Sequence, residues 1–272
     1  MTLDAETHTS RALQQAAFAT LLRRDALVLR KNLREFLPRT ILQPVLLMFV
    51  FTFVMPEIGL AVGGEEGAEL FTTLLVAGVV GSTILFQGIQ GVALPLVQDF
   101  GYTREIEDRV MAPLPVEGVA IAKIVSGAVQ CLFGGLVVFP LAAVVPATDV
   151  SLAVDWPVLL TIIPLACVMA ASMGLLFGVI FDPRTLPLMF GIIVVPLTFL
   201  GCVYYQWSAL AEIRWLQILV LANPLVYICE GARAALTDVE HMSLWAVYPV
   251  MIGFTASMAA VGVTRFRSRV VS

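Results

Sequence analysis

The chain has 272 residues, of which 59% are hydrophobic and 13% are charged, whereas an average soluble domain is about 45–50% apolar and about 25% charged. With a mean hydropathy of +0.93, this composition excludes a soluble globular protein, because no soluble fold buries so much apolar side chain. The formal net charge of −4 excludes little, since the distribution of the charges matters more than their sum.

The first predicted element is an amphipathic helix over residues 11–36, after a polar N-terminal stretch without the features of a secretory signal. Apolar side chains such as Phe18 and Leu29 share one arc of the helical wheel. Basic side chains share the opposite arc: Arg23, Arg24, Arg30, Lys31 and Arg34. This pattern is typical of a helix that lies in the inner membrane interface with its cations toward lipid phosphates. A soluble helix that covers a protein partner is the alternative.

Six apolar segments then follow, each long enough to cross a bilayer core, which takes about 20 residues of α-helix. The predicted spans are residues 37–56, 70–94, 120–145, 158–181, 186–205 and 244–264. The sequence therefore predicts an all-α membrane protein with a single transmembrane domain over residues 1–272.

The basic residues predict how the spans are oriented. Of the 16 Lys and Arg residues, only Arg214 and Arg233 fall on the side opposite to the basic N-terminal segment and the basic C-terminal tail. By the positive-inside rule, both termini are expected in the cytoplasm.

The connection over residues 98–117 is the most charged part of the chain. Glu105 and Arg109 are spaced i,i+4 in the order that supports a short helix, and Pro113 ends it. A compact charged helix indicates a docking element for a cytoplasmic partner, and an ordinary solvated loop is the alternative. The residues expected to form this element are Arg104, Glu105, Glu107, Asp108, Arg109 and Pro113.

Two features inside the spans concern polarity and packing. Gln87 and Gln90 in the second span either bond to neighbouring helices or face a substrate path. Small residues recur at a four-residue interval in the fourth span: Ala166, Ala170, Gly174 and Gly178. They would form one ridge that lets a neighbouring backbone approach closely.

The four cysteines lack C-x-x-C spacing and are expected to be packing residues, so a disulfide between Cys202 and Cys229 is disfavoured.

The stretch WLQILVLANPLVYICEGARAAL, residues 215–236, begins like a span and is interrupted by Asn223 and Pro224. Glu230 and Arg233 follow at the i,i+3 spacing of a helical ion pair. The segment is either a span with buried charges or a structure that enters the membrane and turns back. Aromatic residues lie in and before it: Tyr204, Tyr205, Trp207 and Tyr227. They form an interfacial belt or a stacking surface on a substrate path.

Several chemistries are absent from the sequence. There is no G-x-x-x-x-G-K-[ST] phosphate loop, so the chain is not expected to hydrolyse ATP by that route. The two histidines, His8 and His241, lie outside the predicted spans, and neither an H-E-x-x-H motif nor another metal site is predicted. The middles of the spans lack the acidic residues and lysines that ion-coupled carriers usually need.

Three stretches together match a known pattern: LQPVLLMFVFTFVMP, REIEDRVMAPLPVEGVAIAKI, and IIVVPLTFLGCVYYQWSAL followed by WLQILVLANPLVYICEGARAAL. On these stretches the chain resembles the permease subunits of ABC type-2 exporters, which include daunorubicin-resistance, nodulation and polysaccharide-export permeases. It departs from the family pattern at Val110 and Met111, where members often carry Gly-Thr, and at Gln206, where many carry Pro.

The resemblance implies a half-transporter with six transmembrane helices, an N-terminal amphipathic interface helix, a cytoplasmic coupling helix and an outer re-entrant helical hairpin over residues 207–238. Two such subunits, identical or different, would pair in the lipids of a bacterial inner membrane. Each would bind a separate nucleotide-binding ATPase that holds ATP and Mg²⁺. The permease itself would bind no cofactor and no nucleic acid.

The function that the resemblance implies is ATP-driven export of an amphipathic, drug-like or lipid-linked compound. Export of a polysaccharide or glycan is the alternative within the family. An ATP-independent channel or membrane scaffold is the alternative outside it.

Overall fold

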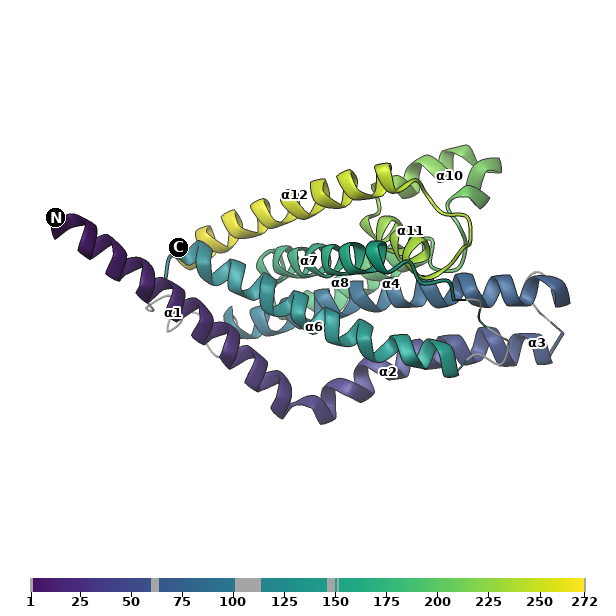
Figure 1. The fold of residues 1–272 in the computed structure, drawn as a ribbon, viewed down its shortest axis with the longest axis horizontal. Coiled ribbons are helices and arrows are strands. Elements are labelled where there is room, and N and C mark those ends of the chain that lie inside the picture. Colours follow the sequence, from purple (N-terminus) through teal and green to yellow (C-terminus); the bar gives the residue numbers. More distant parts are fainter. Residues whose placement is uncertain (1, 60–63, 101–113, 146–149, 151, 272) are drawn as a thin grey trace.

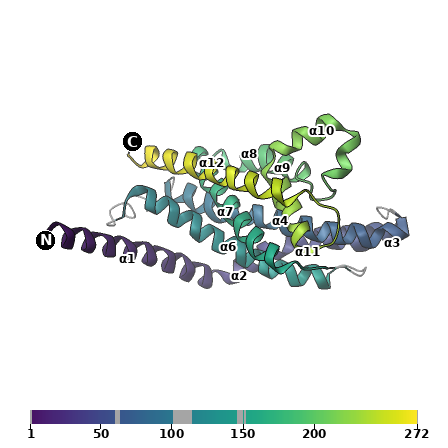
Figure 2. The ribbon, with the colours of Figure 1, turned by 45° about the horizontal axis from the view of Figure 1, so that its top comes forward.

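The computed structural model describes residues 2–59, 64–100, 114–145, 150 and 152–271, and every regular element in these ranges is a helix. The long helices are α1 (Thr2–Lys31), α2 (Leu33–Phe49), α4 (Gly64–Gln98), α6 (Val116–Val144), α7 (Trp156–Ile180) and α12 (Leu244–Val271). They form an elongated bundle in which the N-terminus and the C-terminus lie at the same end (Figures 1 and 2). This end is called the terminal end below, and the opposite end, which carries α10 (Arg214–Leu219), is called the hairpin end.

Five helices are long and apolar enough to cross a membrane, and each overlaps one predicted span. They are Leu33–Glu57, Gly67–Gln98, Val116–Leu141, Trp156–Ile180 and Leu244–Val270. The number rises to six if a helix pair bent between residues 222 and 224 counts as one span. Five passes alone would place the two termini at opposite ends, so the chain between α7 and α12 makes one further net pass.

The predicted span over residues 186–205 is shorter in the structure than the sequence suggested. Its helical run covers residues 186–199, in the order α8 (Leu186–Met189), η3 (Phe190–Val194) and α9 (Val195–Phe199). The prediction was wrong at the C-terminal end, where residues 200–207 leave the helix. Fourteen residues of helix rise about 21 Å, less than the hydrocarbon core of about 30 Å.

A proline follows each of two widened turns in these helices. The π-helical turn η1 (Val50–Val54) leads into α3 (Met55–Glu57), which contains Pro56, and η3 leads into α9, which contains Pro196. A proline ring clashes with the carbonyl group four residues earlier and donates no hydrogen bond. Widening the turn before each proline relieves that clash while the helix continues.

The predicted interface helix over residues 11–36 is divided between two helices. α1 ends at Lys31, Asn32 lies between, and Leu33 begins α2. The five basic residues of this segment are all exposed: Arg23, Arg24, Arg30, Lys31 and Arg34. The apolar side chains Phe18 and Leu21 are half-buried and pack on the core near the start of α6.

α7 forms the centre of the bundle, where it packs against α4, α6 and α12. Its ridge of small residues faces α4. A Cβ atom added to Gly174 would overlap the carbonyl oxygen of Gly88, and one added to Gly178 would lie 3.1 Å from the Cα of Ala93. All four ridge residues are buried: Ala166, Ala170, Gly174 and Gly178. The small side chains therefore set how closely the backbones of α4 and α7 approach.

We expect Gly174→Ala to destabilise the protein by about 1–3 kcal/mol, because the added methyl group has no room against the backbone of α4. Gly253→Ala on α12 is the matched control, since a Cβ atom there meets nothing within 4 Å. Both changes gain the same helix propensity, so the difference between them reports packing. Thermal unfolding of the purified proteins in detergent measures it. Equal unfolding midpoints for the two variants would contradict the close approach of α4 and α7.

Candidate functional site

The bent helix pair lies near the hairpin end and is built around Asn223. α10 and η5 (Val220–Ala222) precede this residue, α11 (Pro224–Leu236) follows it, and the helix axis bends by 96° between them. The Asn223 side-chain oxygen accepts a hydrogen bond from the amide of Leu225 at 3.0 Å, and its amide nitrogen donates to the carbonyl of Leu197 at 2.7 Å. Pro224 occupies the first turn of α11, where a missing N–H is tolerated. The Asn-Pro pair thus ends one arm and starts the other.

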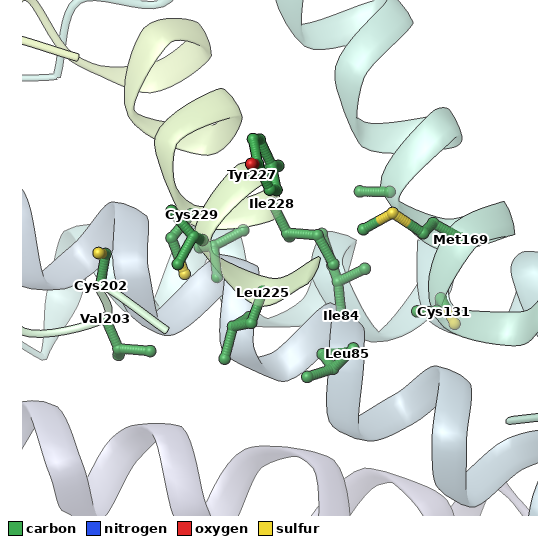
Figure 3. Close-up of a cluster of buried hydrophobic side chains, with 14 of the residues drawn as sticks. Ile84, Leu85, Cys131, Met169, Cys202, Val203, Leu225, Tyr227, Ile228 and Cys229 are labelled. Atoms are coloured by element: carbon green, nitrogen blue, oxygen red, sulfur yellow. The ribbon is translucent and has the colours of Figure 1, made fainter. Parts of the chain in front are cut away.

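All 13 residues of α11 are buried, and the helix packs against α4, α7 and α12. Figure 3 shows Leu225, Ile228 and Cys229 of α11 in the same apolar cluster as Ile84 and Leu85 of α4. All four cysteines are buried and free, as expected for packing residues. α11 is therefore a core element rather than a surface helix.

Glu230 is buried in the middle of this apolar surrounding, with 1% of its surface exposed. One carboxylate oxygen accepts hydrogen bonds from Arg233 at 2.5 Å and from the backbone amide of Trp207 at 3.0 Å. The other oxygen accepts from the backbone amide of Met242 at 2.8 Å. Both oxygens are thus satisfied, as a buried carboxylate requires.

Arg233 is fully buried and holds the non-helical residues that follow α9. Its Nη2 donates to the carbonyl of Cys202 and, at 3.0 Å, to the carbonyl of Tyr205. Cys202 has a left-handed φ of 55°, which a residue with a side chain rarely adopts unless its surroundings hold it there. These backbone groups bond to Arg233 rather than within a helix, which explains why the predicted fifth span stops early.

The contacts of Glu230 also bring together the two ends of the bent pair. Trp207 precedes the pair in the chain and Met242 follows it, yet both amides donate to the same carboxylate. The chain therefore enters and leaves this substructure at one place. The end of α11 lies beside the start of α7, because the amide of Asp155 donates to the carbonyl of Ala235 at 3.0 Å.

Of the aromatic residues predicted for a substrate path, Trp207 and Tyr227 bond to the bent pair, and Tyr204 and Tyr205 bond or pack beside it. Three of them donate to backbone carbonyls nearby: Tyr205 to Phe199 at 3.0 Å, Trp207 to Gln217 at 3.2 Å and Tyr227 to Leu221 at 2.9 Å. Tyr204 packs its ring 5.6 Å from that of Phe51.

Gln87 and Gln90 line a separate cavity between α2 and α4. The side-chain nitrogen of Gln87 donates to the hydroxyl of Thr40 at 2.6 Å. The structure thus divides the predicted substrate-path residues between two places.

The residues predicted to form the coupling element lie outside the described residues: Arg104, Glu105, Glu107, Asp108, Arg109 and Pro113. Both flanks of this segment are described. Asp99, at the end of α4, pairs with Lys123 of α6 at 3.2 Å, and both residues are buried. This ion pair joins the two helices on either side of the segment.

The last turns of α12 contact both flanks as well. Phe100 lies beside Phe266, with ring centroids 5.7 Å apart, and Arg269 stands 4.8 Å from the centre of the Phe100 ring. On the other flank, Arg267 pairs with Glu117 at 3.0 Å. Sequence reasoning gave this tail a role only in orientation, because a cluster of arginines does not reveal its partners.

Comparison with known proteins agrees with this architecture. The family described as ABC-2 type transporter matches residues 16–237. The inner membrane transport permease YadH of Escherichia coli strain K12 is 26% identical over 222 residues, which covers 79% of this chain and 82% of YadH. The YadH proteins of Escherichia coli O157:H7 and Shigella flexneri match over the same lengths with the same identity. No solved structure matches this chain.

We expect Arg233→Ala to destabilise the protein by about 3–5 kcal/mol, because it leaves the Glu230 carboxylate buried without a cation. Arg267→Ala also removes one arginine from an ion pair, but its side chain is 66% exposed, so a loss of at most about 1 kcal/mol is expected. Thermal unfolding and the folded fraction on size-exclusion chromatography measure both. Similar losses in the two variants would show that the buried pair does not hold this region.

Proposed function

The chain belongs to the ABC-2 type transporter family, and from that premise we propose that it is the permease of an ATP-driven exporter of an amphipathic, drug-like or lipid-linked compound. Membership makes the chain a non-catalytic, multi-span subunit in inner membrane transport and implies an ABC ATPase as its partner. The same family membership argues against an ATP-independent channel or membrane scaffold. In this proposal the ATPase alone holds ATP and Mg²⁺, and a second permease subunit completes the transporter.

The proposed docking site for the ATPase is the segment over residues 98–117 at the terminal end. The observation that supports it is that residues on both flanks of the segment make specific contacts with the neighbouring helices. The buried Asp99–Lys123 pair joins α4 to α6, and α12 contacts Phe100 on one side and Glu117 on the other. A displacement at these flanks would act directly on α4, α6 and α12, which they contact. α1, with its exposed basic face, would lie in the membrane interface beside this site.

The bent pair would serve as a re-entrant hairpin on the outer side of the membrane. Two observations support this proposal. Trp207 and Met242 bind the same carboxylate, so the ends of the substructure coincide. Both termini lie at the opposite end, which the positive-inside rule assigns to the cytoplasm. Non-spanning backbone at membrane depth is tolerated where protein buries it, and α11 is entirely buried.

Export of a glycan is the second candidate function. Aromatic faces serve as stacking surfaces for glycans, and hydrogen bonds to backbone carbonyls hold the rings of Tyr205, Trp207 and Tyr227 in place.

We expect the single charge reversals Glu105→Lys and Arg109→Glu to uncouple transport from hydrolysis while expression stays normal. Each removes charge-assisted hydrogen bonds worth about 1–3 kcal/mol, so the ABC ATPase that co-purifies with the wild-type chain should bind each variant roughly 5–150-fold more weakly. Titration of that ATPase onto the permease in nanodiscs measures the affinity.

The matched control is Asp238→Lys, which reverses an exposed charge at the other end of the molecule and should leave the affinity unchanged. Wild-type affinity in both Glu105→Lys and Arg109→Glu would show that this segment is an ordinary loop. Failure of any ABC ATPase to co-purify with the wild-type chain would contradict the proposed transporter itself.

A further inference from the structure

Two adjoining cavities lie where α1, α2, α4 and α6 meet, toward the terminal end. The first, of about 480 Å³, has apolar side chains such as Phe36 and Leu94 in its lining together with most of the polar ones: Asn32, Glu35, Arg39, Gln87, Gln90, Gln98 and Gln130. The second, of about 530 Å³, lies between α1 and α6, and its wall is mainly apolar, with Leu22, Ala26, Leu33, Val125, Val129 and Phe133. Arg23, Asp25, Arg30 and Ser126 also line it. Leu29 and Gln130 line both cavities, so the two are compartments of one hollow with a polar part and an apolar part. Each has the volume of a small-molecule site.

The polar compartment places hydrogen-bonding groups inside helices that are otherwise apolar. Gln87 and Gln90 belong to the apolar span Gly67–Gln98, and Arg39 to the span Leu33–Glu57. Polar side chains within spans are costly in lipid and mark cavities or ligand paths. The hydroxyl of Thr40 fixes the amide of Gln87 at 2.6 Å. Gly91 leaves room for Gln130, since a Cβ atom at Gly91 would lie 2.7 Å from the Gln130 side-chain oxygen.

Arg39 supplies the positive charge of this compartment, whose lining also includes the acidic Glu35. Arg39 is exposed and has no ion-pair partner among the residues that the structure describes. A guanidinium binds phosphate through paired hydrogen bonds, and the side-chain amides of Gln87, Gln90 and Gln130 supply further donors. Glu35, one turn before Arg39 on α2, is an acceptor for a hydroxyl or ammonium group beside that phosphate.

The apolar compartment has exposed apolar side chains in its wall. Val129 is 43% exposed and Phe133 is 51% exposed on α6, and Leu33 is 38% exposed at the start of α2. An acyl chain lying here would cover these side chains while its headgroup reached the polar compartment past Gln130. An amphiphile needs a polar site for its headgroup and an apolar site for its chain, and the two adjoining compartments together provide both.

We propose that this hollow binds one phosphate-bearing amphiphile, such as a phospholipid, that enters sideways from the leaflet at the terminal end. The phosphate lies at Arg39 among the glutamine amides, and one acyl chain lies between α1 and α6. The inference goes beyond the proposed export function, because it assigns a binding site that requires neither the ATPase nor a turnover cycle.

The test is equilibrium binding of phosphatidylglycerol to the purified full chain in detergent, followed by native mass spectrometry. Dioleoylglycerol, which has the same acyl chains without phosphate, is the comparison ligand. We expect one phosphatidylglycerol bound at least about tenfold more tightly than dioleoylglycerol, as loss of a charge-assisted contact predicts. Arg39→Gln should abolish this preference, and Arg34→Gln, a neighbouring exposed arginine outside the lining, should keep it.

A second pair of variants tests the apolar compartment. Val129→Trp fills it and should lower phosphatidylglycerol binding about tenfold or more, whereas Leu132→Trp, equally exposed on α6 and outside the lining, should not. The unfolding midpoint of each variant without lipid shows that it is folded.

Three outcomes would overturn the inference. Equal binding in wild type and Arg39→Gln would mean that the lipid belongs to the general lipid annulus. Displacement of the lipid by millimolar inorganic phosphate would mean that the site takes free phosphate. Equal loss in Val129→Trp and Leu132→Trp would mean that no acyl chain occupies the compartment. Because the measurement contains no ATPase, these outcomes leave the proposed transport function untouched.

Discussion

The buried ion pair between Glu230 and Arg233 constrains the whole hairpin end of the molecule. Two charges can be buried in an apolar core only if each is paired and hydrogen-bonded. Glu230 meets this requirement with the backbone amides of Trp207 and Met242. Arg233 meets it in part, since its Nη2 binds the carbonyl groups that follow α9 whereas its buried Nε has no partner among the described residues. Two segments, one before α11 (residues 202–207) and one after it (Met242), are therefore fixed around this helix. The early end of the fifth helical run and the shared entry and exit of the bent pair both follow from this requirement.

α12 connects that ion pair to the opposite end of the bundle. Met242, two residues before α12 begins, binds Glu230, while Phe266, Arg267 and Arg269 near its end contact the flanks of the predicted coupling segment. Between these ends α12 packs along α7, whose small residues hold α4 at close range. The helix thus makes specific contacts at both ends and packs on the central helix α7 between them.

The sequence was sufficient wherever the governing physics is local. The apolar runs located five helices because spanning length depends on hydropathy alone, and the spacing of Glu230 and Arg233 predicted their contact because it is one helical turn. The four-residue interval of small residues likewise predicted the packing of α7. Long-range partners were beyond such reasoning. The residues around Cys202 give no sign that their carbonyl groups bind Arg233, about 30 residues later in the chain. The predicted fifth span is therefore longer than the observed helix. The division of the N-terminal segment at Asn32 and the two adjoining cavities between α1, α2, α4 and α6 also depend on how the helices pack in space.

The re-entrant hairpin is the central claim, and it requires that the chain between α9 and α12 does not cross the membrane. Single cysteines at Ala211 and Asp238, both exposed, can be treated with an impermeant thiol reagent on intact cells, and the wild-type chain is the control because its four cysteines are buried. A re-entrant hairpin held by Glu230 and Arg233 predicts that both positions are labelled from outside. Labelling of one position from outside and of the other only from the cytoplasm would show that the segment spans the membrane.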